Sequence, residues 1–250
     1  MKVLITGASS GIGKDFAKLL INKYDELILV ARDDTKLKKL KEELNKVPNK
    51  RVKIIPLDLS VKENLRKLYE DNKDVDLLIN NAGFGDCGYF YKTSLDKDID
   101  MINTNIVAVH ILTKLYLSEM IKRNKGHILN VASVAGFMPG PLMATYYSSK
   151  SYVVKFSESI REELKHLKSD VKISVLCPGP VKTNFEKTAN VQFQVSKAKS
   201  SDVANYALKH LNKFYIIPGF GTKLAHIGAK LLPTSLVSKM VYKVQKKRVG

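Results

Sequence analysis

The amino-acid sequence predicts an α/β fold, a doubly wound parallel sheet of seven strands covered by helices. Short, continuous apolar runs alternate along the chain with longer segments whose apolar residues recur at helical spacing. The apolar runs show no polar alternation, and strands buried on both faces are typical of parallel sheets. No change in composition and no Gly/Ser-rich linker divides the 250 residues. We therefore expect a single domain over residues 1–250.

The first half of the chain shows three pairs of strand and helix, followed by a fourth strand. The opening run ends at Thr6 and Gly7, and Phe16 and Leu20 then recur at helical spacing after the glycines. The expected strands of this half are 3–5, 27–31, 52–57 and 77–79, and the expected helices are 12–24, 35–47 and 61–72.

The second half continues the alternation with longer helices. Ser200 or Ser201 is expected to cap a helix, because a serine side chain accepts a hydrogen bond from the free N–H groups of a first turn. The expected helices of this half are 95–123, 145–167 and 201–211, and the expected strands are 127–131, 172–176 and 214–217.

Residues 220–250 extend the fold with two basic amphipathic helices. The first is expected at 223–232, and the second follows Pro233 with Thr234 as its cap. Lysines fall largely on the side of the second helix that faces away from its apolar residues. Such a pair can pack on its own domain, seal a subunit interface or lie on an anionic bilayer. Packing on protein is the commonest fate of these helices and is our expectation.

The cysteines and histidines argue against a disulfide framework and a metal site. Cys87 and Cys177 stand 90 residues apart, and the five histidines are scattered. The first apolar run is too short for a signal peptide, and no apolar run has the length that spans a bilayer. We therefore expect a cytoplasmic protein in a reducing compartment.

The net charge of +18 is concentrated towards the end of the chain. From Lys187 to Gly250 there are twelve Lys/Arg and one acid, Asp202, which gives this part a net charge of +11. A solubilising surface is the simpler interpretation. The other is attraction to an anionic partner: a phosphate-bearing substrate, an acyl carrier, a lipid head group or nucleic acid.

A glycine-rich turn lies between the first strand and the first helix. The segment 6–13 reads Thr-Gly-Ala-Ser-Ser-Gly-Ile-Gly, with the glycine spacing G-x-x-x-G-x-G. Glycines let a backbone turn sharply against a pyrophosphate, and the helix N-terminus supplies free N–H groups. This spacing departs from the commoner G-x-G-x-x-G, but its position favours nucleotide binding.

Arg32 follows the second strand, at the position that sets the ribose preference of a dinucleotide site. An arginine there favours the 2′-phosphate of NADP, whereas an acid favours the 2′-hydroxyl of NAD. Asp33 and Asp34 follow at once and are alternative partners for Arg32. Asp58, after the third strand, is placed either to contact the adenine or to form an ordinary turn.

Tyr146 and Lys150 stand four residues apart where a helix begins, so they share a helical face. An ammonium about 4 Å from a phenol contributes roughly 4 kcal/mol at an effective dielectric of 20, or about 3 pKa units. Lys150 is thus expected to lower the pKa of Tyr146 into the range of a working acid. Tyr147 also lies within reach of the same lysine.

With these residues, the chain resembles the short-chain dehydrogenase/reductases (SDRs) over about residues 2–219. The segment 6–13 resembles the family's TGxxxGIG turn, 80–83 its NNAG motif, and 178–183 its nicotinamide-holding segment. The resemblance favours Tyr146 over Tyr147 as the acid. The family's catalytic positions correspond to Asn105, Ser133, Tyr146 and Lys150. The residues implied to bind the cofactor are Gly7, Ser9, Ser10, Gly11, Ile12, Gly13, Arg32, Asp58, Leu59, Asn81, Ala82, Gly83, Tyr146, Lys150, Pro178, Gly179, Val181 and Thr183.

The resemblance implies a Rossmann-type fold and hydride transfer between NADP and a carbonyl or alcohol carbon. Tyr146 would donate a proton to the forming alkoxide, and Ser133 would orient the carbonyl. Lys150 would lower the tyrosine pKa and hold the nicotinamide ribose, and Asn105 would support a proton-relaying water. The family also implies a homodimer or homotetramer, and cofactor choice here depends on Arg32, because Ser10 stands where many NADP-dependent members have a basic residue.

A modest lid is expected at 184–199, after the nicotinamide segment. Its apolar residues, with those of the loop after Ser133, favour a hydrophobic ketone, a 3-oxoacyl compound or a steroid-like substrate. The alternative is a non-catalytic NADP sensor or scaffold whose basic tail binds membrane or nucleic acid. The intact set of four catalytic positions argues against this alternative, and we expect no nucleic acid partner. The apolar residues in question are Phe185, Val191, Phe193 and Val195 of the lid, and Phe137, Met138, Leu142 and Met143 of the loop.

Overall fold

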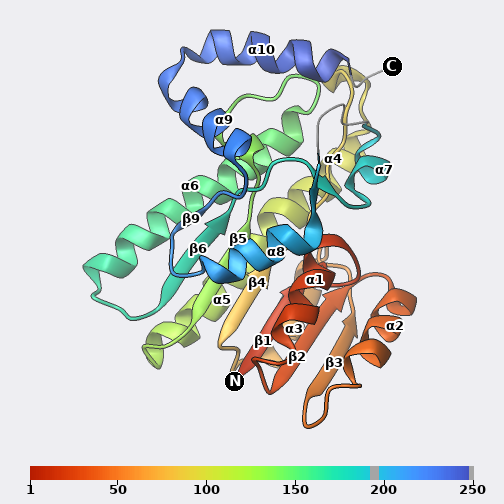
Figure 1. The fold of residues 1–250 in the computed structure, drawn as a ribbon, viewed down its shortest axis with the longest axis vertical. Coiled ribbons are helices and arrows are strands. Elements are labelled where there is room, and N and C mark those ends of the chain that lie inside the picture. The colour runs from red at the N-terminus through yellow and green to blue at the C-terminus, as the bar shows by residue number, and fades with distance from the viewer. Residues whose placement is uncertain (192–196, 248–250) are drawn as a thin grey trace.

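One seven-stranded parallel sheet forms the centre of the protein (Figure 1). The computed structural model describes residues 1–191 and 197–247. The strand order is β3-β2-β1-β4-β5-β6-β9, which confirms the predicted number of strands and their parallel direction. The strands are β1 (Lys2–Thr6), β2 (Glu26–Ala31), β3 (Arg51–Pro56), β4 (Leu77–Asn80), β5 (His127–Val131), β6 (Lys172–Leu176) and β9 (Tyr215–Ile216).

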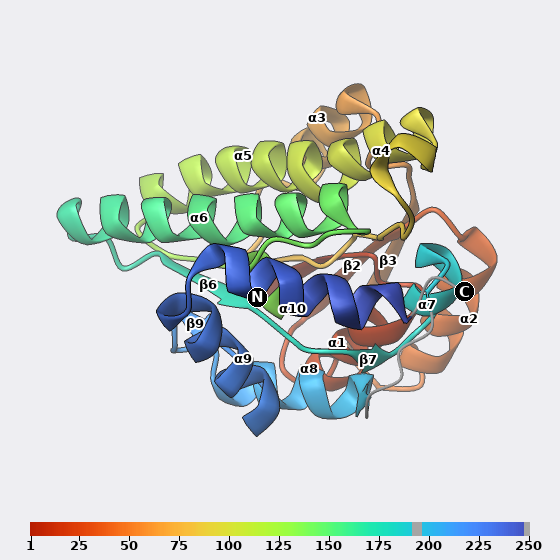
Figure 2. The ribbon, with the colours of Figure 1, turned by 90° about the horizontal axis from the view of Figure 1, so that it is seen from above.

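Helices cover both faces of the sheet (Figure 2). One core forms between the sheet and α1, α2 and α8, with Phe16, Leu37 and Val203 among its members. The other forms beneath α3, α5 and α6 and includes the fully buried ring of Tyr116. These helices are α1 (Gly11–Leu20), α2 (Asp34–Leu44), α3 (Lys62–Glu70), α5 (Ala108–Lys122), α6 (Ala144–His166) and α8 (Ser200–Lys209).

The strand order reverses at β1, which pairs with β2 on one side and β4 on the other. The loops that leave the carboxyl ends of β1 and β4 run to helices on opposite faces of the sheet. Doubly wound sheets bind ligands at such a point. The Thr6 hydroxyl joins the two ends: it accepts from the backbone N–H groups of Asn81 (2.9 Å) and Ala82 (3.0 Å). The fold therefore places the predicted site at this edge.

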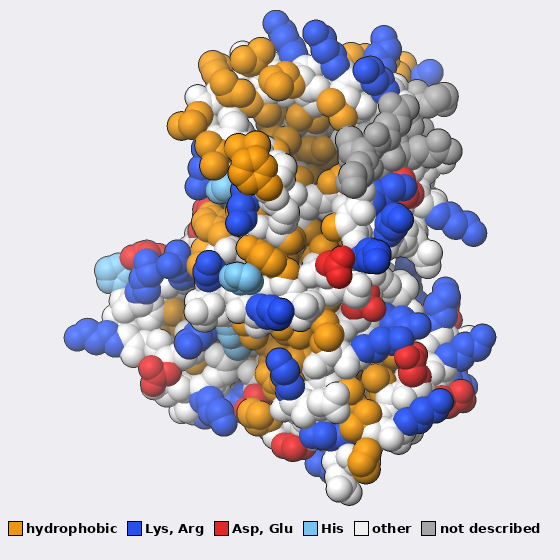
Figure 3. All heavy atoms as spheres, viewed as in Figure 1, with side chains coloured by type: hydrophobic (Ala, Val, Ile, Leu, Met, Phe, Trp, Pro, Cys, Tyr) orange, Lys and Arg blue, Asp and Glu red, His pale blue; other side chains and the backbone are white. Residues whose placement is uncertain are grey.

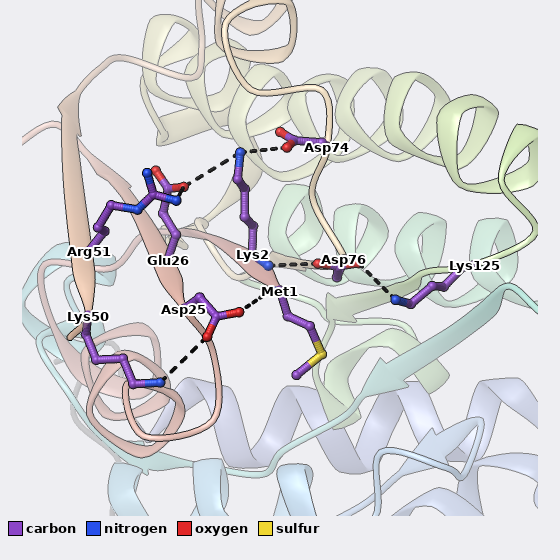
Figure 4. Close-up of polar contacts among 9 residues, drawn as sticks. All are labelled: Met1, Lys2, Asp25, Glu26, Lys50, Arg51, Asp74, Asp76 and Lys125. Atoms are coloured by element: carbon purple, nitrogen blue, oxygen red, sulfur yellow. Dashed lines mark hydrogen bonds and ion pairs between the residues drawn. The ribbon is translucent and has the colours of Figure 1, made fainter.

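The opposite edge of the sheet carries ion pairs instead of loops of functional interest (Figure 4). The amino terminus of Met1 pairs with Asp25, and the Lys2 ammonium lies 2.6 Å from Asp74. The backbone N–H of Lys2 donates to Asp76 at 2.8 Å. Exposed pairs of this kind contribute about 0–1 kcal/mol each, so they add little to the stability of the fold.

Three details differ from the sequence prediction. The helix expected at 95–123 is divided into α4 (Leu95–Ile102) and α5 by one π-helical turn, η2 (Asn103–Val107). Neither Ser200 nor Ser201 caps α8, because the helix starts at Ser200 and Lys199 occupies the cap position while pairing in β8. Thr234 does not cap either, since it is the first residue of its helix and follows Pro233.

The segment after β6 forms small elements that the sequence analysis did not anticipate. A short parallel ribbon joins β7 (Val181–Lys182) to β8 (Ala198–Lys199), and α7 (Phe185–Ala189) lies between them in sequence. Two 3-10 turns, η1 (Phe90–Lys92) and η3 (Val134–Phe137), occur in the loops after β4 and β5. Phe193 and Val195 of the expected lid lie outside the described residues.

The two C-terminal helices lie outside the layers, beyond the carboxyl edge of the sheet (Figures 1 and 2). They are α9 (Phe220–Leu231) and α10 (Thr234–Lys246), close to the predicted ranges. No residue of α9 is buried, and α10 buries only Val237 and Gln245. The expectation that this pair packs on its own domain is therefore met on one side only. No helix in the described part of the chain is long and apolar enough to span a membrane.

Candidate active site

The loop from β1 to α1 is a tight turn that requires glycine at two positions. Gly7 and Gly11 have φ angles of +65° and +52°, in the left-handed region that side chains with a Cβ rarely adopt. A Cβ on Gly13 would lie 2.4 Å from the Gly7 carbonyl oxygen, so α1 packs directly under the turn. The Ser10 side chain does not cap α1. The first N–H groups of the helix are therefore available to an anion.

A cavity of about 870 Å³ opens beside this turn. It is walled by the turn, the strand ends of β2 to β6, the first turn of α6, the segment after β6 and both C-terminal helices. Every residue that the sequence analysis assigned to the cofactor lines the cavity except Gly13, which lies beneath the turn. Residues separated by more than 170 positions in the chain, such as Gly7 and Thr183, thus share one wall.

Arg32 lies on the rim of the cavity and is not taken up by the neighbouring acids. Asp33 accepts from the backbone N–H of Lys36 and pairs with its ammonium at 2.6 Å, and Asp34 pairs with Lys38 at 2.7 Å. Among the described residues Arg32 forms no ion pair. The acids prefer the lysines because the first turn of α2 brings those lysines within one helical turn of them.

Asp58 lines the same end of the cavity. Burial acts to raise its pKa, but hydrogen bonds from the Ser60 N–H and hydroxyl, together with the Arg32 charge, hold the pKa below its usual value. The carboxylate is therefore ionised near neutral pH. Asp58 therefore both forms a turn, by accepting from the Ser60 N–H, and lines the cavity.

Ser133, Tyr146 and Lys150 meet at the other end of the cavity. Ser133 follows β5 and caps η3, where its hydroxyl accepts from the Ala135 N–H at 3.2 Å, and it acts to lower the pKa of Tyr146 in the first turn of α6. The Lys150 ammonium, one turn further, donates to the Val131 carbonyl at 2.9 Å and lies 5.9 Å from the centre of the Tyr146 ring. The geometry brings together three of the four predicted catalytic side chains.

The expected lowering of the Tyr146 pKa by Lys150 is wrong for the protein in this state. Burial raises the pKa of Tyr146, and the hydrogen bond with Ser133 offsets this only in part. Lys150 does not offset the effect of burial on the pKa of the protonated phenol, because its own ammonium is buried and donates to the Val131 carbonyl. Burial lowers the Lys150 pKa to about 8. Removal from water, which disfavours the charged form of both groups, is here the stronger effect.

Tyr147 is engaged elsewhere, although it neighbours Tyr146. The amide of Gln245 in α10, a side chain 1% exposed, donates to the Tyr147 hydroxyl at 2.7 Å. Gly140 packs under the Tyr147 ring, where a Cβ would come within 2.0 Å of it. The two tyrosines therefore have separate partners, Ser133 and Gln245.

Asn105 is fully buried in the π-helical turn and does not line the cavity. Its amide nitrogen donates to the Phe84 carbonyl at 2.9 Å and to the Ser149 hydroxyl at 3.0 Å, and its oxygen accepts from the Phe84 N–H at 3.1 Å. Asn105 thus ties the loop after β4 to α6, the helix that carries Tyr146 and Lys150.

A family model described as short chain dehydrogenase matches residues 1–193. The chain belongs to the short-chain dehydrogenase/reductase family. It is 33% identical over 197 residues to a "Very-long-chain 3-oxoacyl-CoA reductase" of Anas platyrhynchos, covering 76% of this chain and 62% of that protein. The chain spans about half to three fifths of the length of the first curated relatives it matches.

Solved structures of SDR proteins share the fold over most of their length. A short-chain dehydrogenase from Sphingobium yanoikuyae in complex with NADPH is 26% identical, with a TM-score of 0.83 over 92% of this chain and 93% of that one. An SDR from Burkholderia phymatum in complex with NAD is 25% identical, with a TM-score of 0.82 over 92% and 94%. Both nicotinamide cofactors thus occur among the solved SDR structures that share this fold.

The residues of this SDR fit a dinucleotide. The glycines at positions 7 and 11 bring the backbone of the turn to the cavity wall, and a Cβ on Gly11 would come 2.8 Å from the Thr183 methyl group. Free N–H groups of α1 suit a pyrophosphate, Arg32 suits a 2′-phosphate, and Lys150 suits a ribose. The helix N-terminus, Arg32 and Lys150 all lie at the one cavity, where a single dinucleotide would contact them.

The C-terminal helices supply cavity residues that the sequence analysis assigned no place in the site. Met240, Val241 and Gln245 line the wall opposite the glycine turn. Met138 and Met143 also line the cavity, as expected, and the Phe185 ring lies 5.1 Å from that of Tyr146. Val191 and Leu142 are buried outside it, and Phe137 packs on His226 of α9 at 4.0 Å. The amphipathic pattern of the helices was visible in the sequence, but not which element would receive them.

Proposed function

We propose that this SDR is an NADP-dependent oxidoreductase that reduces the carbonyl group of a hydrophobic substrate. One observation carries the proposal. A single cavity joins Arg32 and the glycine turn at one end to Ser133 and Tyr146 at the other, and most of its remaining wall is apolar. A carbonyl compound bound against this wall meets both a proton donor and the cofactor end.

The division of chemical roles follows from the surroundings of each side chain. The nicotinamide cofactor, when bound, supplies the hydride. The hydroxyl of Ser133 holds the carbonyl oxygen, and the Tyr146 hydroxyl, which lines the same cavity, donates its proton to that oxygen. Burial keeps Tyr146 protonated, which is the form needed for donation.

Lys150 and Asn105 support this pair from within the protein. With a pKa of about 8, Lys150 is mostly protonated at pH 7 and stabilises negative charge on Tyr146 once its proton has left. Lys150 also holds the cofactor ribose. Asn105 keeps the loop after β4 and helix α6 in register through its three hydrogen bonds. We propose residues 184–199 as the lid over this end, since Phe185 packs on Tyr146.

The apolar wall favours a long or bulky hydrophobic ketone, with 3-oxoacyl thioesters as the first class to test. Relatives that share a third of the residues are named very-long-chain 3-oxoacyl-CoA reductases. The basic surface of the last sixty residues suits the anionic carrier that such acyl groups have. A homodimer or homotetramer is proposed from the family, and size-exclusion chromatography with light scattering measures it.

The decisive experiment is a screen of NADPH oxidation over ketones, 3-oxoacyl thioesters, steroids and quinones. We expect Tyr146→Phe to lower kcat by about 10²- to 10⁴-fold, the usual worth of a positioned acid. Tyr147→Phe, the matched control, keeps kcat within about tenfold and lowers the free energy of unfolding by about 1–3 kcal/mol, because it leaves the Gln245 amide buried without its acceptor. Activity retained in Tyr146→Phe and lost in Tyr147→Phe would reverse the assignment.

A further inference from the structure

We propose that the outer side of α9 and α10 docks on an anionic membrane surface. Apolar side chains that no part of the described fold covers line this side, and between 45% and 78% of each is exposed. The four that stay clear of the main cavity, with the lysines beside them, define what we name the docking face: Phe220, Ile227, Leu231 and Leu236 with Lys223, Lys239, Lys243 and Lys246.

The spacing puts these residues on one side of each helix. Phe220, Ile227 and Leu231 recur at 7 and 4 residues in α9, which keeps them on one face. In α10 the lysines 239, 243 and 246 lie beside Leu236, while Gln245 faces the protein and bonds to Tyr147. Hydrophobic side chains accordingly gather over α9 and α10, with lysines along the outer rim (Figure 3).

Charge identifies the occupant as a lipid surface and argues against a second copy of the chain. Residues 220–247 contain six lysines and no acid. Two copies that met through this face would bring eight positive charges together, four from each docking face, and like charges in an interface disfavour association. An interfacial helix with an apolar stripe and adjacent lysines instead gains from both the acyl boundary and anionic head groups.

A loop attached to α10 carries further exposed aromatic residues. Tyr89 and Tyr242 of α10 are hydrogen-bonded at 3.2 Å, which ties η1 to the helix. Phe90 and Tyr91 follow, and they are 68% and 78% exposed. Aromatic rings of this kind favour the head-group level of a bilayer.

Docking would place the membrane at the cavity mouth. Leu224 and Met240 are each about half exposed and also line the cavity, so the cavity opens between α9 and α10 beside the docking face. A hydrophobic substrate dissolved in the bilayer would then reach the site without crossing water, a consequence that rests on the proposed function. The docking itself does not depend on that function.

Vesicle flotation of the full chain, without cofactor or substrate, tests the docking. We expect binding to phosphatidylcholine vesicles that contain about one third phosphatidylglycerol and little binding to phosphatidylcholine alone. Raising the salt from about 0.05 M to 0.5 M should release the protein, because it shortens the Debye length. Failure to float with the anionic vesicles overturns the proposal and leaves the catalytic assignment untouched.

Two variants and their matched controls separate docking from general stickiness. Lys239→Gln/Lys243→Gln/Lys246→Gln and Phe220→Ser/Leu231→Ser should each weaken binding at least about tenfold. The controls Lys62→Gln/Lys67→Gln/Lys114→Gln and Leu167→Ser, exposed residues of other elements, should leave binding unchanged. Thermal unfolding checks that all variants are folded. Equal binding by variants and controls, or a dimer that the face variants abolish, would contradict the proposal.

Discussion

Tyr146 and Tyr147 show how completely the surroundings of a residue decide its chemistry. Both are tyrosines in the first turn of α6, yet the pKa of one responds to burial and to Ser133, and the hydroxyl of the other accepts from Gln245 of α10. Lys150 was expected to act on Tyr146 through its charge, but burial dominates and shifts the pKa of the two groups in opposite directions. Burial thereby keeps the tyrosine protonated, as an acid must be, and brings the pKa of the lysine to about 8.

Arg32 should decide the cofactor preference. We expect Arg32→Ser to weaken NADPH binding about 10- to 100-fold, because hydrogen bonds to a charged group contribute about 1.5–3 kcal/mol, and to leave NADH binding nearly unchanged. Fluorescence titration of both cofactors measures this. Lys38→Ser is the control, since Lys38 is already paired with Asp34 away from the cavity. An equal loss for NADPH and NADH would remove Arg32 from the proposal.

His127, at the start of β5, should make the fold sensitive to acid. Burial lowers its pKa to about 4, and its ring nitrogen is hydrogen-bonded to the Ser174 hydroxyl at 2.9 Å. The unfolded chain binds the proton below about pH 6.5 and the native protein does not, so stability falls as pH drops from 6.5 towards 4. The loss at pH 5 is up to about 2 kcal/mol.

Urea unfolding of the wild-type protein and His127→Gln at pH 7 and pH 5 isolates this contribution. The variant should lose less stability between the two pH values than the wild type, whatever its absolute stability. The carboxylates and the other histidines titrate in both proteins, so their contributions cancel in the difference. Parallel pH dependence would show that His127 is protonated without cost in the native state.

At the scale of elements, the side chains of α10 meet three different surroundings. One side lines the cavity through Val241 and Gln245, the opposite side carries the lysines, and Tyr242 joins η1. The helix has only two buried residues, so it is held by few contacts compared with α5 or α6.

A larger side chain on the cavity-lining side of α10 should therefore discriminate between substrates. We expect Val241→Trp to raise KM for long-chain 3-oxo substrates and to spare short ketones, at about 0.8 kcal/mol for every methylene that no longer fits. NADPH affinity should stay unchanged, because Arg32 and the glycine turn lie at the other end of the cavity. Leu231→Trp on the outer side of α9 is the control. A KM rise for short and long substrates alike would mean that α10 does not select chain length.

In the part of the chain that the structure describes, two large hydrophobic cores lie against the sheet, and a smaller apolar cluster lies beside the candidate site at the carboxyl edge. The cores lie on opposite faces of the sheet and contain the parallel strands of both halves. The loops at the carboxyl edge carry the glycine turn, Ser133 and the segment 178–183, whereas the amino edge carries ion pairs. The two faces of the sheet thus carry the buried apolar contacts that stabilise the fold, and its carboxyl edge carries the candidate site.

Cofactor binding should consequently stabilise the whole fold. At about 100 times its dissociation constant, NADPH contributes roughly 2.7 kcal/mol, which raises Tm by about 5–10 °C in a protein of this size. NADH at the same concentration should raise Tm less. Differential scanning fluorimetry measures both shifts, with Arg32→Ser as the comparison. The expectation fails if NADPH does not move Tm.

The sequence located the sheet well because its strands are continuous apolar runs, a local signal that does not depend on the rest of the chain. The motifs were recognisable for the same reason, since the glycine turn and the Tyr146–Lys150 spacing are each contained in a few residues. The π-helical turn at Asn103–Val107 was missed, because a shift in backbone hydrogen bonding leaves the apolar periodicity of a long helix almost intact.

The sequence by itself determined the parallel α/β fold, the family and the identity of the residues at the carboxyl edge. Only the tertiary structure decided what those residues do to one another. The bond between Tyr147 and Gln245 joins positions 98 residues apart, and the burial of Lys150 depends on strands and helices from both halves of the chain. Pairing and burial are properties of the assembled protein, because desolvation and contact depend on what surrounds a side chain and not on its neighbours in sequence.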